Sequence, residues 1–312
     1  MAVEASTREA YGNALVGLGK QDPDIVVLDA DLSPSTMTRY FAEAFPDRFF
    51  DCGLEEQNMI GIAAGLAASG KTVFASSFAI FVSCRCFDQL RICLSQMALN
   101  AKIVATHSGI TVGEDGASHQ AVEDLALYCS LPGFTVVVPS DAVETAQAVK
   151  VAASTPGPFY VRLSRSRTPL VHSEGYHFTL GKAVVLRPGK DVTIVAVGIM
   201  VAKALEAAEV LAEEGIDCQV ASMPTVKPLD ERFVAQAAWD TGSIVVAEEH
   251  LAHGGLGSRV AQVVAREKPV PMCFVNLGDR YAVSGKAEEL VQRYGLTAGD
   301  IAVAARIAVQ RK

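Results

Sequence analysis

Short runs of Val, Ile and Phe alternate with longer amphipathic segments along almost the whole chain, and this pattern limits the possible folds most strongly. In the first half the apolar runs cover 25–28, 49–52, 72–76, 102–106, 134–138 and 159–163. They show no apolar–polar alternation, which is typical of strands buried on both faces. Helix-like stretches lie between them, near 8–18, 55–68, 81–96, 119–128 and 142–153. Strand–helix–strand repetition with right-handed crossovers predicts a doubly wound α/β fold with a mostly parallel sheet.

A second series of the same kind follows toward the end of the chain. Strands are expected at 192–197, 218–221, 243–247 and 272–275, and helices at 201–214, 230–238, 256–265, 286–294 and 298–310. Between the two series, a polar stretch with Pro and Gly covers about 166–190 and is suited to a linker. We therefore expect two doubly wound α/β domains, 1–180 and a smaller 181–312.

The composition excludes several classes of protein. The 27 Lys and Arg against 35 Asp and Glu give a net charge of −8, whereas binding to a nucleic-acid backbone needs concentrated positive charge. The longest apolar stretch is interrupted by Arg85 and is too short to span a membrane, and the N-terminus has no signal-peptide pattern. The seven cysteines have no disulfide or zinc spacing. We expect a cytoplasmic protein with reduced thiols, in which Cys84, Cys86 and Cys93 are small buried residues.

Polar side chains gather directly after the predicted strands of the first domain. The clusters cover 29–35, 51–59, 106–109, 113–120 and 164–165. In open parallel sheets, ligands bind beyond the carboxyl ends of the strands, at the loops that lead into helices. The sequence therefore predicts a functional site at this edge of the first sheet.

Two features near this edge, the glutamates of the cluster at 51–59 and a set of phenylalanines, also have a purely structural interpretation. Glu55 and Glu56 open a helix, where the helix dipole favours carboxylates. However, the same helix is rich in Gly and Ala and should pack closely, which would bury a carboxyl at its start and let it share a proton with a base. Phe74, Phe78 and Phe81 have the spacing of a helical core stripe.

The Gly-rich stretch 109–116 is not a phosphate-binding loop, because it lacks the Gly-Lys-Ser/Thr ending and the Gly-x-Gly-x-x-Gly spacing. It could be a mobile loop, but His107 and His119 bracket it and together indicate a pocket. In the second half, the glycines of 254–257 fit either an anion site or an ordinary helix start.

Together these segments resemble the C-terminal section of transketolase, meaning its pyrimidine-binding domain followed by its C-terminal domain. The resemblance covers almost the whole chain, from Arg8 to about Arg306. Its most specific parts are 106–107, 113–120 and the Pro-Ser-Asp run at 139–141.

The resemblance implies a role in binding thiamine diphosphate for four residues. Glu56 matches the family's catalytic glutamate, which hydrogen-bonds N1′ of the cofactor's aminopyrimidine. Proton sharing at that atom lets the cofactor lose its thiazolium C2 proton and act as a nucleophile. Phe81 and Phe78 match aromatic residues that pack on the aminopyrimidine, and Asp31 matches an acid on the cofactor side.

The resemblance also implies contacts to a phosphorylated sugar. The matching positions are the sugar-phosphate contacts Arg8, Ser35, His107 and Arg165, and the hydroxyl contacts Asp115 and His119. Guanidinium forks suit phosphate oxygens, which agrees with a sugar phosphate as substrate. The two histidines join Glu56 as the catalytic residues implied. Cys84 departs from the family, which commonly has Tyr at that position.

One family feature is absent from the sequence. Transketolases hold the diphosphate and a divalent metal through Gly-Asp-Gly and a downstream Asn in an N-terminal domain, and no Gly-Asp-Gly occurs here. We therefore expect no metal ligands on this chain, and a partner chain that binds the diphosphate through Mg²⁺, or Ca²⁺ or Mn²⁺ in its place. Because the family builds its sites across a dyad, the expected assembly is an α2β2 heterotetramer.

The favoured hypothesis is a subunit of a split transketolase that transfers a two-carbon ketol unit from a ketose phosphate to an aldose acceptor, active only with its partner. A beta subunit of a 2-oxo-acid dehydrogenase and a relative of deoxyxylulose-phosphate synthase remain open, because both share the Glu and the two-domain layout. A catalytically silent assembly subunit is the non-enzyme alternative. A dinucleotide-binding oxidoreductase is least favoured, since its glycine fingerprint is missing.

Overall fold

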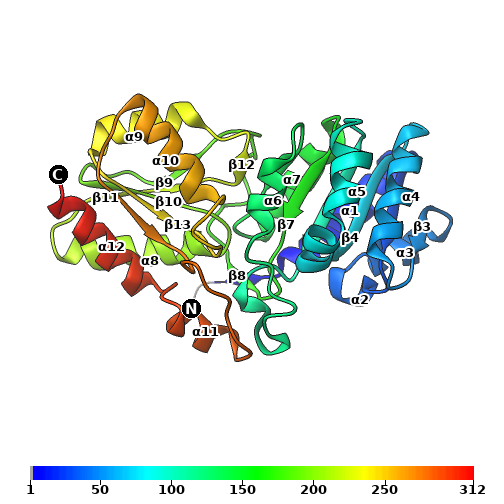
Figure 1. Cartoon of the computed structure of the whole chain (residues 1–312), viewed down its shortest axis with the longest axis horizontal. Helices are drawn as coiled ribbons and strands as arrows, with labels where there is room; N and C mark the ends of the chain where they lie inside the picture. Colours follow the sequence, from blue (N-terminus) through cyan, green and yellow to red (C-terminus); the bar gives the residue numbers. More distant parts are fainter. Residues whose placement is uncertain (1–2) are drawn as a thin grey trace.

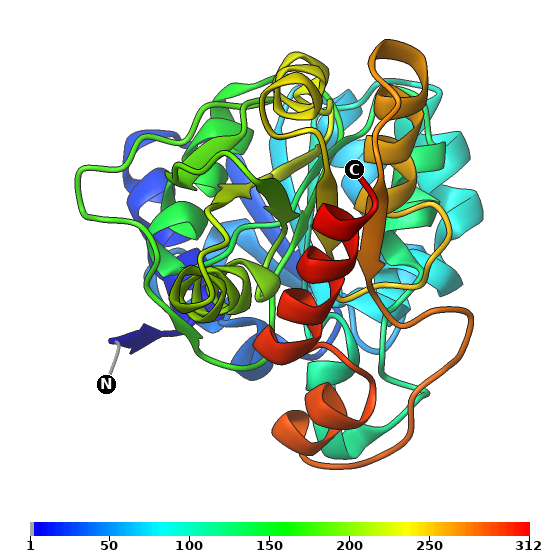
Figure 2. The same ribbon diagram turned by 90° about the vertical axis from the view of Figure 1, so that its left-hand side faces the viewer.

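The computed structural model describes residues 3–312, which form two α/β lobes that lie side by side (Figure 1). The first lobe is built on a seven-stranded sheet and the second on a five-stranded sheet. Figure 2 views the molecule from the second lobe, with helix α12 (Ala298–Gln310) in front. Two doubly wound α/β lobes are the fold that the sequence predicted, and the structure confirms it.

The first sheet has the strand order β12-β6-β7-β5-β4-β2-β3. Its neighbouring strands run parallel, except that β12 is antiparallel to β6. The strands are β2 (Ile25–Asp29), β3 (Phe49–Asp51), β4 (Thr72–Phe78), β5 (Ala101–Thr106), β6 (Thr135–Val137), β7 (Phe159–Arg162) and β12 (Thr225–Lys227). Because β12 comes from the second half of the sequence, it ties the two lobes together at the edge of this sheet.

Helices cover both faces of the first sheet. One face packs against α1, α3 and α7 around Phe74 and Val104, and the other against α4, two π-helical segments and α6 around Ile60 and Ile103. These elements are α1 (Thr7–Gln21), α3 (Arg39–Ala44), α4 (Glu56–Ala68), η2 (Phe81–Arg85), η3 (Leu90–Ser95), α6 (Asp124–Ser130) and α7 (Ala142–Ser154). Shorter turns are α2 (Ser33–Thr36), η1 (Pro46–Arg48), α5 (Phe87–Gln89) and η4 (Ile110–Asp115).

The second sheet has the order β14-β13-β10-β11-β9, with only β9 antiparallel to its neighbour. Its strands are β9 (Val184–Arg187), β10 (Val192–Ala196), β11 (Cys218–Ser222), β13 (Ile244–Ala247) and β14 (Met272–Val275). Helices α9 and α10 cover one face, α8 and α12 cover the other, and α11 packs against η4 of the first lobe. The bounds of these helices are α8 (Met200–Glu213), α9 (Glu231–Thr241), α10 (Leu256–Glu267) and α11 (Ala287–Arg293), and those of α12 are given above.

Two local predictions were wrong. Strand β4 includes Phe74, as the apolar run at 72–76 predicted, but it continues to Phe78, which pairs with Thr106, so the interpretation of these phenylalanines as a helical stripe was wrong. Helix α6 begins at Asp124 instead of 119. The reason is that Ala121 forms a bridge with Ser108, so the segment before α6 is extended alongside the loop that follows β5.

The expected helix at 81–96 is largely wound as π-helix, in segments η2 and η3. Its wider turns change which side chains face inward. Cys86 is buried as predicted, but Cys93 is only half-buried and Cys84 is exposed, so the prediction for these two residues was wrong. All seven cysteines are free.

The stretch expected to be a linker is packed against both lobes. It contains β8 (Thr168–Pro169), which pairs with β1 (Glu4–Ala5), and strand β9 of the second sheet. His172 is buried, and its Nδ1 lies 3.2 Å from Oδ2 of Asp141 at the start of α7. Within residues 3–312, no helix is long and apolar enough to cross a membrane.

Candidate active site

The carboxyl ends of the parallel strands bring the predicted site residues to one edge of the first sheet. Phe78 ends β4 and pairs with Thr106, the last residue of β5, and Ala105 pairs with Arg162 at the end of β7. The next residues along the chain are therefore neighbours in space, as the sequence pattern predicted.

Four aromatic and imidazole rings from three segments meet at this edge. The ring of His107 stacks on Phe78, with centroids 3.8 Å apart and planes inclined by 19°. Phe78 also stacks against Phe81 at 5.9 Å, and His119 meets Phe81 edge-on at 5.3 Å. The structure thus brings together Phe78, Phe81, His107 and His119, which are separated by up to 41 positions in the sequence (119 − 78).

His107 is held in one orientation and kept uncharged. Its backbone has the left-handed φ of 58°, and its Nδ1 lies 2.8 Å from the hydroxyl of Thr106. Burial, with smaller contributions in the same direction from the nearby Arg8, Arg165 and His119, lowers the pKa of His107 to about 3. The imidazole is therefore neutral near pH 7 and can exchange hydrogen bonds with a bound hydroxyl or carbonyl.

Arg8 and Arg165 lie beside this ring cluster. Arg8 donates from Nη1 to the carbonyl of Ser35 at 2.6 Å and from Nη2 to the carbonyl of Arg165 at 3.1 Å. Arg165 donates to the carbonyl of Val112 and lies 3.5 Å from the carboxylate of Asp115. The structure thus brings Ser35 and Asp115 to the arginines, although only the backbone carbonyl of Ser35 makes the contact.

The two arginines line a cavity of about 340 Å³ together with Lys286 from the second lobe, and Glu114 and Glu288 also line it. The Nε of Arg8 is buried without a hydrogen-bond partner among the described residues. Burial is also the largest cause that lowers the pKa of Arg8, followed by the neighbouring charge of Arg165. Clustered cations and a free buried donor suit an anionic group such as a phosphate.

Glu56 is the first residue of α4 and is buried, at 1% exposure. Sequence reasoning expected this burial, but for a partly wrong reason. Ala63 and Ala64 do pack inward, whereas Gly61 and Gly65 face outward with open space around them. The glycines therefore leave one face of α4 open instead of burying the carboxyl.

The carboxylate of Glu56 is paired with a residue that the sequence did not single out for function. Nη1 of Arg85 donates to Oε2 of Glu56 at 2.6 Å. The same guanidinium lies over the ring of Phe81, with its central carbon 4.7 Å from the ring centroid. Arg85 thereby links Glu56 to the ring cluster. Its only sequence signal is that a charged residue interrupts an otherwise apolar stretch.

Asp31 stands apart from this cluster. It is exposed in the loop after β2, with a left-handed φ of 60°, and its N–H donates to the carboxylate of Asp51 at 3.0 Å. The neighbouring Asp29 is buried instead, and burial raises its pKa to about 6. The cofactor-side role of Asp31 stays a prediction.

The second lobe fixes the Gly-rich loop, which the sequence left as a possible mobile segment. Oε1 of the buried Glu249 accepts the N–H of Thr111 at 2.7 Å. Gly109 has φ of 74°, and a side chain there would collide with the carboxylate of Glu249. Nothing in the sequence connects Glu249 with a loop 138 residues earlier.

The glycines at 254–257 belong to a helix start and not to an open anion site. The carboxylate of Glu248 accepts the N–H groups of Leu256 and Gly257 at 2.7 and 2.8 Å, so the first turn of α10 already has its anion. Within residues 3–312, no group of three or more His, Cys, Asp or Glu side chains is arranged to hold a metal ion.

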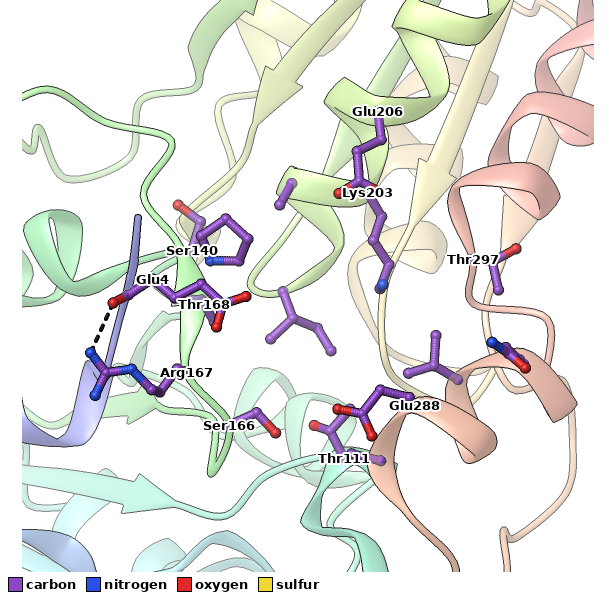
Figure 3. A pocket seen from close by; sticks show the side chains of 16 residues that line it. Glu4, Thr111, Ser140, Ser166, Arg167, Thr168, Lys203, Glu206, Glu288 and Thr297 are labelled. Carbon is purple, nitrogen blue, oxygen red and sulfur yellow. Dashed lines mark hydrogen bonds between the residues drawn. The ribbon is translucent and has the colours of Figure 1, made fainter. Parts of the chain in front are cut away.

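A second cavity, of about 370 Å³, lies between the two lobes next to the arginine cavity (Figure 3). Lys203 reaches into it from α8, on the side opposite Thr168. Thr111 and Glu288 line both cavities, so the two spaces adjoin.

A mostly parallel α/β lobe followed by a smaller α/β lobe is the fold of the thiamine-dependent transketolase family. Residues 3–170 match the transketolase pyrimidine binding domain, and residues 181–301 match the transketolase C-terminal domain. The chain belongs to the transketolase family and corresponds to its C-terminal section.

Similar proteins of the same length support this assignment. The chain is 45% identical, over 95% of its length and 93% of the relative, to a protein of Methanocaldococcus jannaschii described as a transketolase C-terminal section. It is 42% identical to a 6-deoxy-6-sulfo-D-fructose transketolase subunit of Clostridium sp. strain MSTE9, over 98% of this chain and 95% of that one. A solved structure of a split-gene transketolase, an inactive β4 tetramer, superposes with a TM-score of 0.91 at 50% identity and covers 99% of this chain and all of that one.

Proposed function

We propose that this chain is one subunit of a split, thiamine diphosphate-dependent transketolase that moves a two-carbon ketol unit from a ketose phosphate to an aldose acceptor. One observation carries the proposal: the buried carboxylate of Glu56 and the ring of Phe81 approach the same planar group, the guanidinium of Arg85. A flat, nitrogen-bearing ring of the cofactor would need the same pair of neighbours. The adjoining rings and arginines then supply the substrate side of the site.

The residues at this edge fit the aminopyrimidine part of the cofactor. Glu56 offers a buried carboxyl that can hold or give up a proton at a ring nitrogen, and Phe81 and Phe78 offer apolar ring faces. When bound, thiamine diphosphate supplies the nucleophilic carbon that accepts the two-carbon unit. Asp31 is proposed as a further cofactor contact, through its place in the loop that follows β2.

The substrate contacts follow from charge and protonation. Arg8 and Arg165 line the cavity that would hold the sugar phosphate, with Ser35 beside them. His107 is neutral near pH 7 and, with His119, would hydrogen-bond the carbonyl and hydroxyl groups of the sugar and move protons there. Asp115, which lies 3.5 Å from Arg165, would accept a hydroxyl.

The diphosphate and its Mg²⁺ would be bound by a partner chain, an N-terminal transketolase section. In support, the relatives that match this chain from end to end are named as a section or a subunit, and the β4 tetramer of a split-gene transketolase is named inactive. Ile62, at 38% exposure, lies on the open face of α4, and Leu54, at 69% exposure, lies in the loop just before this helix; both provide apolar surface for assembly. We propose an α2β2 heterotetramer.

The test is reconstitution with the partner chain, thiamine diphosphate and Mg²⁺. Ketol transfer between ketose phosphates and aldoses is expected from the mixture and not from either chain by itself. Full transfer by this chain without the partner would refute the two-chain proposal. Release of CO₂ from pyruvate by the mixture would instead favour a 2-oxo-acid dehydrogenase or deoxyxylulose-phosphate synthase. Absence of cofactor binding by the assembled pair would favour a silent subunit.

A further inference from the structure

The guanidinium of Arg85 has an unusual pair of contacts. It donates to the nearly inaccessible carboxylate of Glu56 at 2.6 Å, and it lies over the ring of Phe81 at 4.7 Å. A guanidinium is planar, carries N–H donors at its edge, and stacks on aromatic faces. Arg85 thus presents a flat, nitrogen-bearing group that hydrogen-bonds the carboxylate and covers the ring.

These two contacts are those that the proposed function assigns to the aminopyrimidine. A ring that packs on Phe81 and hydrogen-bonds Glu56 needs the space that the guanidinium now fills, so the two groups exclude each other. In the chain without cofactor, Arg85 also prevents an energetic problem, because a buried carboxylate that loses its only charged partner is strongly destabilising. The pair therefore keeps the site intact until the cofactor arrives.

The side chain of Arg85 can also move away from Glu56 into solvent. Its side chain is 50% exposed, whereas that of Glu56 is 1% exposed. Its backbone carbonyl is anchored by Nε2 of Gln57 at 2.9 Å, so the main chain need not move. Among the described residues, its guanidinium has no other hydrogen bond or ion pair than that to Glu56. A long side chain that is half in water can turn outward at small cost.

We infer that Arg85 is an internal placeholder, which occupies the aminopyrimidine position of the cofactor-free chain and swings out when thiamine diphosphate binds. This inference rests on the proposed function and adds a competition that weakens cofactor binding. Removing the guanidinium removes the competitor. Because the side chain of Arg85 is half exposed, solvent reduces the free energy of this charged hydrogen bond, and its removal corresponds to about 3- to 30-fold in the dissociation constant.

Calorimetric titration of the assembled complex with thiamine diphosphate and Mg²⁺ tests the inference. Arg85→Met should bind the cofactor about 3- to 30-fold more tightly than wild type. Arg91→Met, which removes an exposed arginine from η3, should bind it like wild type. Assembly of each variant is checked by size-exclusion chromatography.

A structure of the wild-type complex with bound cofactor provides a second measurement that needs no variant. Arg85 is expected to point into solvent or toward the partner chain, with Glu56 facing the cofactor. Unchanged or weaker binding by Arg85→Met, or a loaded complex in which Arg85 still donates to Glu56, overturns the inference and leaves the proposed function standing. Failure of wild type and both variants to bind the cofactor overturns the proposed function, and the inference with it.

Discussion

The imidazole of His107 lies flat on the phenyl ring of Phe78, with the ring centroids 3.8 Å apart. Phe78 is the last residue of β4, and His107 directly follows β5, so the pairing of these two strands brings the rings together. The stack covers the imidazole on one face, and burial is the main reason why its pKa falls to about 3. Because the buried histidine stays neutral, the free energy of unfolding should depend on pH.

His107 should make the folded chain less stable in mild acid. Between its ordinary pKa of 6.5 and about 3, the unfolded chain takes up a proton on this side chain and the folded chain does not. Stability is therefore lost as pH falls through that window, with a slope of at most about 1.4 kcal/mol per pH unit from this group. Urea unfolding of wild type and His107→Gln between pH 7 and 5 measures the difference. Identical pH slopes in the two proteins would contradict the assigned burial.

Replacing either site arginine should weaken reaction with phosphorylated substrates. Arg8→Met and Arg165→Met each remove a cation from the proposed phosphate cavity. The loss of one charge-assisted contact predicts a decrease of about 10- to 150-fold in kcat/KM for a ketose phosphate, with little change for the unphosphorylated ketose. Arg167→Met is the matched control, because Arg167 lies two residues further on and lines the other cavity (Figure 3). Equal losses for both sugars would argue against phosphate recognition.

A buried ion pair beneath the site should be important for stability. Oδ2 of Asp124 accepts from Nε of Arg162 at 2.7 Å and from the hydroxyl of Tyr160 at 2.6 Å. Asp124→Ala leaves the Arg162 charge buried without its partner, so a loss of about 3–5 kcal/mol is expected in chemical unfolding. Asp24→Ala, which breaks an exposed pair with Lys71, should cost less than about 1 kcal/mol. The account is wrong if the two variants lose similar stability.

His172 should act on stability in the opposite direction to His107. Its Nδ1 lies 3.2 Å from Asp141 and its Nε2 lies 3.7 Å from Glu144. Although burial lowers the pKa of His172, the hydrogen bond to Asp141 and the charges of both carboxylates outweigh it, and the net pKa is raised. Its contribution is therefore complete below 6.5 and is lost as pH rises through the folded-state pKa. His172→Gln should remove that part of the pH dependence, which differential scanning fluorimetry across pH 6 to 9 can measure.

The strand and helix pattern was enough to predict the two lobes, because strands buried on both faces are continuous apolar runs. The same rule located the site edge, since parallel strands place their carboxyl ends together. Prediction failed where pairing with a distant segment determines the backbone conformation. Ala121 pairs with Ser108 in the loop after β5, so α6 begins later in the sequence than expected. The extension of β4 to Phe78 likewise depends on its pairing with Thr106.

The contacts of individual side chains were beyond sequence reasoning. The Arg85–Glu56 pair depends on π-helical turns, which no spacing rule indicated. Glu249 comes from the other lobe, and only the packing of the two lobes places it under the Gly-rich loop. Local sequence patterns predict the helices and strands and the edge of the sheet where a site lies, whereas such long-range side-chain pairs form only when those helices and strands pack together.

The most direct measurement is the rate at which the thiazolium C2 proton of bound thiamine diphosphate exchanges with deuterium in the assembled complex, followed by NMR after acid quenching. The account predicts that Glu56→Gln slows this exchange by about 10²- to 10⁴-fold with assembly intact, because a positioned carboxyl contributes that much to proton transfer. Glu55→Gln, at the exposed neighbouring position, should exchange like wild type. Wild-type exchange in Glu56→Gln would contradict the central claim.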